Sequence, residues 1–199
     1  MSVVGPKARA ILQTIVTDDL ADEAFPFMAA RPITLKSGVA GRLYRISFSG
    51  ELAYELGVPA GYGEAVADAV MEAGQSEGIC AYGVEALNVM RIEKGHVTHA
   101  ELDGRVTADD VGLGKMVSAT KPDFIGKRLL DRYGMRAADR AQLVGLKPVD
   151  PKADIKSGAH ILKIGATAST ANDQGWVSSV CFSPALGHMI ALAFVKSGR

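Results

Sequence analysis

The apolar and polar residues that alternate on both sides of Ser49-Gly50-Glu51 constrain the fold more than any other feature of this 199-residue chain. Before the turn, one face of the extended segment carries Tyr44, Ile46 and Phe48. After the turn, one face of the returning segment carries Leu52, Tyr54, Leu56 and Val58. Because side chains alternate between the faces of a strand, the pattern predicts two antiparallel strands within residues 31–58. It also predicts that Glu55 points away from the apolar face.

Helical spacing of apolar residues predicts helices on both sides of this hairpin. The predicted helices span Lys7–Val16, Glu64–Ala73, Gly83–Glu93 and Asp123–Tyr133. We expect the first of them to open the chain without a preceding strand. Residues 18–30 are predicted to be a connection held in place by the burial of Phe25 and Phe27.

The pattern of apolar residues changes near Met135. We therefore place a domain boundary there, between residues 1–135 and 136–199. Short apolar or β-branched runs follow, separated by Gly, Pro and Asn, at residues 141–148, 160–164, 175–182 and 189–195. Such runs are typical of a small antiparallel β barrel or sandwich. The sequence therefore predicts an α+β chain, with an antiparallel sheet and packed helices followed by a small β domain.

Three segments resemble, in the same order, motifs of the glycine-cleavage T-protein (aminomethyltransferase) superfamily. They are the hairpin Arg45–Leu56, the helix that ends in Arg91-Ile92-Glu93-Lys94-Gly95, and Asp123-Phe124-Ile125-Gly126-Lys127. The resemblance implies a folate-binding aminomethyltransferase-like fold with a C-terminal β barrel. It also implies a preceding stretch that this chain lacks, so we expect the fold to be incomplete at its N-terminus.

Within the superfamily, His96–Gly104 and Trp176–Arg199 look like the large (alpha) subunit of heterotetrameric sarcosine oxidases. This implies a C-terminal module that transfers the one-carbon unit of oxidised sarcosine to tetrahydrofolate, giving 5,10-methylenetetrahydrofolate and glycine. FAD, FMN and NAD are implied only for other parts of such a complex. The implied partners are tetrahydrofolate and the other sarcosine oxidase subunits, and the isolated chain is expected to lack oxidase activity.

The resemblance implies that Glu55 holds the pterin ring of tetrahydrofolate. The chemistry agrees, because an ionised carboxylate offers two acceptors to the two adjacent N–H donors of the ring. Two non-functional alternatives stay open for Glu55: it is solvated on the strand, or it pairs with a neighbouring arginine.

Arg91 is the second predicted folate-binding residue. It emerges on the apolar face of the predicted helix 83–93, beside Val84 and Leu87, and a partly buried arginine needs an acid. We expect Glu55 or Glu93 to supply it, either to orient the folate-binding carboxylate or in a structural salt bridge. Two departures from the family pattern, Leu87 in place of Arg and Phe48 in place of Tyr, imply weaker or differently oriented folate binding.

Other motifs are rejected. His96, His99, Glu101 and Asp103 suggest a metal site, but no third ligand stands out and Gly95 ends the helix before them, so we expect no metal. Gly112-Leu113-Gly114 lacks the strand and helix of a dinucleotide site, and no elbow motif surrounds Ser47 or Ser49. No residue is identified as a catalytic acid or base.

Composition narrows the class of protein. The 22 basic and 22 acidic residues balance, so we expect no nucleic-acid or membrane partner. No apolar run approaches the roughly 18 residues of a membrane helix, and Cys80 and Cys181 match no metal or redox spacing, which favours a cytoplasmic protein.

Two rival functions remain. The first is a stand-alone folate-dependent aminomethyltransferase or demethylase whose upstream half is supplied separately. The second is a non-catalytic scaffold fragment that braces an oligomer. If the upstream half is absent, apolar surface made to face it should be exposed and should favour self-association.

Overall fold

The computed structural model describes residues 1–199 and separates into two compact units, Met1–Met90 and Arg91–Arg199. The helix α3 (Val84–Lys94) begins in the first unit and ends in the second. Each unit is described by itself. None of the helices combines the length and the apolar character needed to span a bilayer.

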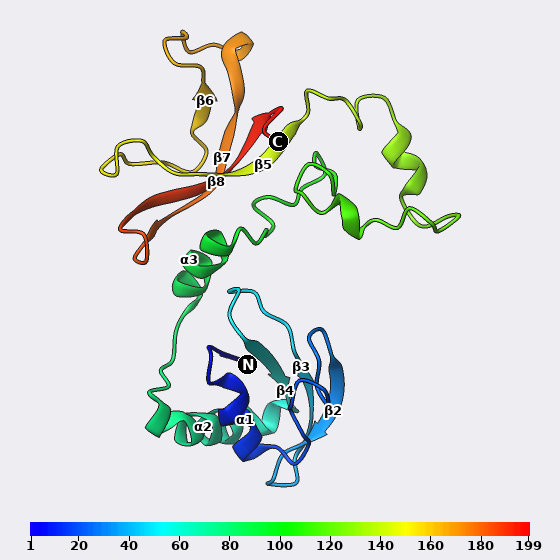
Figure 1. Ribbon diagram of the computed structural model, residues 1–199, viewed down its shortest axis with the longest axis vertical. Coiled ribbons are helices and arrows are strands. Elements are labelled where there is room, and N and C mark those ends of the chain that lie inside the picture. Colours follow the sequence, from blue (N-terminus) through cyan, green and yellow to red (C-terminus); the bar gives the residue numbers. More distant parts are fainter. The chain divides into compact units, whose positions relative to one another are not determined.

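The first unit is an antiparallel four-stranded sheet with two α-helices packed against it (Figure 1). Along the sheet the strands run in the order β1, β4, β3, β2. The elements before α3 are, in chain order, β1 (Ser2–Val4), α1 (Ala8–Ile15), β2 (Ala30–Thr34), β3 (Ala40–Tyr44), β4 (Ala53–Gly57), η1 (Ala60–Tyr62), α2 (Gly63–Gly74) and η2 (Gln75–Glu77). The predicted helices at 7–16, 64–73 and 83–93 are confirmed by α1, α2 and α3.

One apolar core holds this unit together. Leu12 of α1, Val66 of α2 and Tyr54 of β4 are buried in a single cluster with side chains from the other strands. Complete burial of a large apolar side chain contributes about 1.5–3 kcal/mol. The core therefore sits between the helices and the face of β4 that carries Tyr54 and Leu56, as the alternation predicted.

The start of the chain and the hairpin differ from the prediction. Ser2–Val4 forms the strand β1, which pairs with β4, so the expectation of no strand before the first helix was wrong. The predicted strand through Phe48 ends at Tyr44, and residues 45–52 form a loop. In that loop the backbone N–H of Gly50 donates to the Ser47 hydroxyl at 2.9 Å, a local bond that competes with strand pairing.

The connection at residues 18–30 is held by one aromatic residue rather than two. Phe25 is buried in the core, which confirms half of the prediction. Phe27 is 70% exposed, so its predicted burial was wrong. The next residue, Met28, has a positive φ of 68°, and its backbone N–H donates to the carbonyl of Arg45, which turns the chain back toward β3.

The second unit contains a four-stranded antiparallel sheet in the order β5, β8, β7, β6 (Figure 1). Its strands are β5 (Ala141–Leu146), β6 (His160–Leu162), β7 (Asp173–Ser183) and β8 (His188–Lys196). The short 3-10 helices of this unit are η3 (Gly114–Met116), η4 (Lys127–Asp131) and η5 (Thr170–Asn172). All four strands predicted after residue 136 are confirmed.

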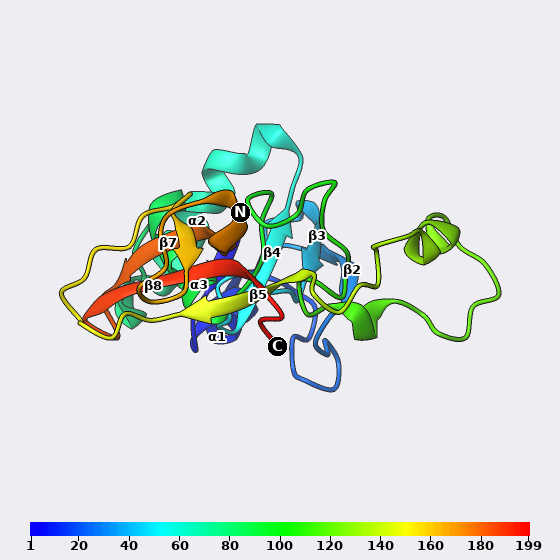
Figure 2. The same cartoon turned by 90° about the horizontal axis from the view of Figure 1, so that it is seen from above.

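The long connection between η3 and β5 stands away from this sheet in both views (Figures 1 and 2). An α-helix was predicted at 123–133, but only the 3-10 helix η4 forms there. Gly126, the residue just before η4, has a positive φ of 91°, which is incompatible with a continuous α-helix through this segment. Ile125 and Tyr133 on this connection are fully exposed. The predicted boundary at residues 135/136 falls between η4 and β5.

Candidate functional site

Glu55 lies on β4, a strand with a neighbour on each side. It is opposite Ser2 of β1 in one direction and opposite Tyr44 of β3 in the other. The residues before and after it, Tyr54 and Leu56, are buried in the core. Because neighbouring side chains on a strand point to opposite faces, Glu55 lies on the face away from the helices.

That face is hollowed into a cavity of about 130 Å³. The cavity is lined by residues of β1, the loop 45–52, β4, the connection after η2, and α3. They are Ser2, Val4, Ile46, Phe48, Ser49, Ala53, Glu55, Tyr82 and Leu87. All of them belong to the first unit. The strand that the sequence reasoning missed, β1, thus supplies one wall of the cavity around Glu55.

The half-buried carboxylate of Glu55 has no hydrogen-bond or ion-pair partner in the structure. The arginines of the sheet strands, Arg31 and Arg42, are exposed, and Arg45 at the start of the following loop is engaged elsewhere. Arg45 donates to the Phe25 carbonyl at 2.8 Å and pairs with Asp22 at 2.5 Å. An acceptor group in a cavity without a protein donor is suited to receive donors from a ligand.

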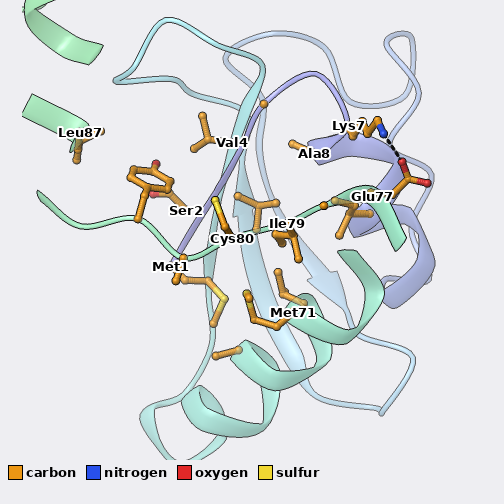
Figure 3. A pocket seen from close by; sticks show the side chains of 18 of the residues that line it. Met1, Ser2, Val4, Lys7, Ala8, Met71, Glu77, Ile79, Cys80 and Leu87 are labelled. Atoms are coloured by element: carbon orange, nitrogen blue, oxygen red, sulfur yellow. Dashed lines mark ion pairs between the residues drawn. The ribbon is translucent and has the colours of Figure 1, made fainter. Parts of the chain in front are cut away.

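A larger groove of about 730 Å³ adjoins this cavity (Figure 3). It runs along β1 and the start of α1, past Met71 of α2 and Ile79 and Cys80 of the connection, to Leu87 of α3. Most of its lining is apolar, and an exposed ion pair between Lys7 and Glu77 at 2.6 Å lies at its edge. Four residues line both hollows: Ser2, Val4, Tyr82 and Leu87.

Arg91 lies in the second unit, where it is 3% exposed. Its guanidinium donates to the Glu101 carboxylate at 2.9 Å and to the Ser179 hydroxyl at 2.7 Å. The acid that it meets is therefore Glu101, which the sequence reasoning did not pair with it. Glu101 is completely buried.

The Glu101 carboxylate accepts further hydrogen bonds from the Thr98 backbone N–H at 2.9 Å and from the hydroxyls of Ser178 at 2.8 Å and Ser179 at 2.5 Å. Burial alone would raise the pKa of Glu101, but these hydrogen bonds and the charge of Arg91 outweigh it and hold the pKa below its usual value. The network joins the end of α3, the loop after it and β7.

A sequence signal for this network existed. Thr98 and Glu101 have the S/T-x-x-E spacing in which the two residues exchange hydrogen bonds with each other's backbone. Here the Thr98 N–H donates to the Glu101 carboxylate as in that pattern, whereas the Glu101 N–H donates to the Thr98 backbone carbonyl, at 3.0 Å, and not to its hydroxyl. The same segment carries the four residues that suggested a metal site.

Of the other candidate ligands of that segment, His96 and Asp103 lie in ordinary structural contacts and His99 is exposed. Gly95 ends α3 with a positive φ of 81°, and the N–H of His96 donates back to the carbonyl of Arg91 at 2.8 Å, as in a Schellman motif. Asp103 pairs with Arg105. The structure brings together no group of three or more His, Cys, Asp or Glu side chains that could hold a metal ion. Cys80 and Cys181 are both free.

Two family models match successive parts of the chain. Residues 1–121 match the family model of the GCVT N-terminal domain, and residues 142–199 match that of the glycine cleavage T-protein C-terminal barrel domain. The chain therefore belongs to the glycine cleavage T-protein family. The predicted fold class, an antiparallel sheet with packed helices followed by a C-terminal β-barrel domain, is confirmed.

Individual relatives are similar over the whole chain. The sarcosine oxidase subunit alpha of Rhizobium meliloti (strain 1021) is 58% identical over all of this chain and 20% of its own length. That of Corynebacterium sp. (strain P-1) is 42% identical over all of this chain and 21% of its own length. This chain thus spans about a fifth of the length of these relatives.

Shorter relatives match as well. The aminomethyltransferase of Desulforamulus reducens is 31% identical over 98% of this chain and 51% of its own length. Among solved structures, the glycine cleavage system aminomethyltransferase T from Bartonella henselae matches with a TM-score of 0.67 over 96% of this chain and 50% of that one. At 23% sequence identity, this last match establishes a shared fold.

Proposed function

We propose that this chain is the folate-binding module of a sarcosine oxidase alpha-type subunit, and that Glu55 holds the pterin ring of tetrahydrofolate. The observation that carries the proposal is the carboxylate of Glu55, which lines a cavity and has no protein partner. The 58% identity to a sarcosine oxidase alpha subunit supports the choice of parent protein.

The donor pattern of the pterin fits the cavity. A pterin presents a 2-amino group and the adjacent ring N–H on one edge, and a carboxylate can accept from both at once. The cavity of about 130 Å³ is smaller than the roughly 300–1,000 Å³ usual for whole small-molecule sites. It therefore suits the ring alone, with the rest of the ligand outside it.

The proposed reaction passes the one-carbon unit of the imine of oxidised sarcosine to two nitrogens of tetrahydrofolate, N5 in the pterin ring and N10 just outside it. The products are 5,10-methylenetetrahydrofolate and glycine, and the two hydrogens leaving those nitrogens end on the glycine amine. In this chain Glu55 binds and orients the pterin, and the apolar wall around it excludes water. Orientation of aligned reactants can lower a barrier by roughly 7–11 kcal/mol without a protein acid or base.

Arg91 is kept as the second folate-binding residue of the proposal. Its burial with Glu101 and Ser179 fixes the position of its guanidinium, which a binding residue requires. Arg91→Lys keeps the charge and changes the geometry. The proposal expects this variant to bind tetrahydrofolate more weakly, and equal affinity would remove Arg91 from the site.

We also propose that the parent assembly brings other sarcosine oxidase subunits against this chain in the cytoplasm. The relatives that support this are named as alpha subunits. Fully exposed Ile125 and Tyr133, on the connection between η3 and β5, are apolar surface of the kind that contacts a partner or drives self-association of the isolated chain.

The experiment that tests the function is an anaerobic calorimetric titration of the chain with tetrahydrofolate. The proposal predicts saturable binding at one site. A titration without saturable heat would contradict it and would favour the scaffold alternative, in which the chain only braces an assembly.

A further inference from the structure

Tyr82 forms part of the wall between the cavity around Glu55 and the adjoining apolar groove. Four residues line both hollows, and Tyr82 is the aromatic one among them. A ring in this place is suited to contact a flat ligand in the cavity, and its hydroxyl adds a donor that apolar walls lack.

The hydroxyl of Tyr82 makes no hydrogen bond within the structure, and the residue is 39% exposed. Burial raises the pKa of Tyr82, so the group stays protonated at neutral pH. The Glu55 carboxylate and the Tyr82 hydroxyl, neither of which has a protein partner, thus line the same cavity. One is an acceptor and the other is a neutral donor.

The position of Tyr82 follows from a close contact earlier in its connection. The N–H of Ile79 donates to the carbonyl of Gly74 at 3.1 Å. A Cβ atom added to Gly74 would lie 2.6 Å from the Cβ atom of Ile79, so this approach requires glycine. The contact holds the connection against the end of α2, three residues before Tyr82.

We propose that Tyr82 positions the pterin ring by donating its hydroxyl hydrogen to the 4-oxo oxygen, beside the two donors that Glu55 accepts. This inference rests on the proposed function. The pterin edge presents donor, donor and acceptor in sequence, and Glu55 with Tyr82 presents the complementary acceptor, acceptor and donor. Tyr82 therefore selects a 4-oxo ring over a 4-amino ring, whose group at that place is a donor.

The test compares Tyr82→Phe with the unsubstituted chain by calorimetric titration. Loss of one neutral hydrogen bond predicts roughly two- to tenfold weaker binding of tetrahydrofolate. A 4-amino tetrahydropterin should bind the two proteins equally. The matched control is Tyr62→Phe, because Tyr62 is exposed and lines neither hollow.

Stability serves as a separate readout. Because the Tyr82 hydroxyl has no partner in the ligand-free protein, Tyr82→Phe should leave the melting temperature unchanged.

The outcomes separate this inference from the proposed function. If Glu55→Gln weakens binding and Tyr82→Phe does not, the role of Tyr82 is wrong and folate binding stands. Equal loss of 4-oxo and 4-amino ligand affinity in Tyr82→Phe would also overturn it. If the unsubstituted chain binds no tetrahydrofolate, the proposed function fails and this inference fails with it.

Discussion

The carboxylate of Glu101 accepts a hydrogen bond from the guanidinium of Arg91 at 2.9 Å, and both side chains are buried. A buried charge is tolerated only when it is paired and hydrogen-bonded. Arg91 and Glu101 satisfy each other, and Ser178, Ser179 and Thr98 complete the acceptor bonds of the carboxylate. The second unit therefore depends on this pair more than on its exposed ion pairs.

Replacing Glu101 by Gln should destabilise the chain by about 3–5 kcal/mol, because the buried Arg91 loses its counter-charge. Urea unfolding followed by circular dichroism measures the loss. The matched control is Asp154→Asn, which breaks the exposed pair with Lys156 and should leave the midpoint unchanged. A loss below about 1 kcal/mol for Glu101→Gln would contradict the role assigned to the pair.

Acid should destabilise the protein through Glu101 and Asp110. The pKa of Asp110 is also held below its usual value, because hydrogen bonds and charge from Arg140 and bonds from Thr107 outweigh the effect of burial. A carboxyl whose pKa is lower in the folded state contributes stability that is present above its unfolded pKa, about 4. That stability is lost as the pH falls below 4 through the folded pKa.

Unfolding free energies measured from pH 7 down to pH 2.5 test this dependence. The difference in stability between the unsubstituted chain and Glu101→Gln should shrink as the pH falls below about 4, since protonated Glu101 no longer supplies a charge. A difference that stays constant over this range would show that the charge of Glu101 does not stabilise the fold.

Local patterns predicted much of the fold. The strands of the second unit follow apolar runs separated by turn residues, and Glu55 faces away from Tyr54 and Leu56 because of simple alternation. The strand β1 was missed because three residues are too few to show a period. It exists through long-range pairing with β4, which no local pattern reports.

The contacts around the two predicted site residues, Glu55 and Arg91, could not be predicted from the sequence. The acid beside Arg91 proved to be Glu101, ten residues along the chain, and Ser179 comes from a distant strand. The cavity around Glu55 combines side chains from five separate segments, including Tyr82 after η2. Tertiary packing decides which side chains from separate segments meet. The sequence alone shows only that Glu55 and Arg91 are charged.

Phe48→Tyr should strengthen tetrahydrofolate binding roughly two- to fivefold. Phe48 lines the cavity around Glu55, and a hydroxyl on its ring would add a hydrogen-bond donor where the ring now presents only apolar atoms. Calorimetric titration measures the gain, with Phe27→Tyr as control because Phe27 is 70% exposed and lies outside the cavity. Unchanged or weaker binding by Phe48→Tyr would show that the pterin does not approach Phe48.

The isolated chain should show no sarcosine oxidase activity. The proposed division of labour assigns the oxidation to a flavin held in another part of the parent complex, and this chain to the transfer that follows. Oxygen consumption with sarcosine, with and without added FAD and FMN, checks this expectation. Sustained turnover above the buffer rate would refute the division.

The central claim is that the unpaired carboxylate of Glu55 receives the pterin. The most direct measurement is the affinity for tetrahydrofolate of Glu55→Gln against the unsubstituted chain, with Glu51→Gln, an exposed glutamate outside the cavity, as control. In Glu55→Gln an amide donor replaces one acceptor oxygen and faces the ring donors, which predicts binding about tenfold weaker or more. Equal affinities for all three proteins would contradict the account.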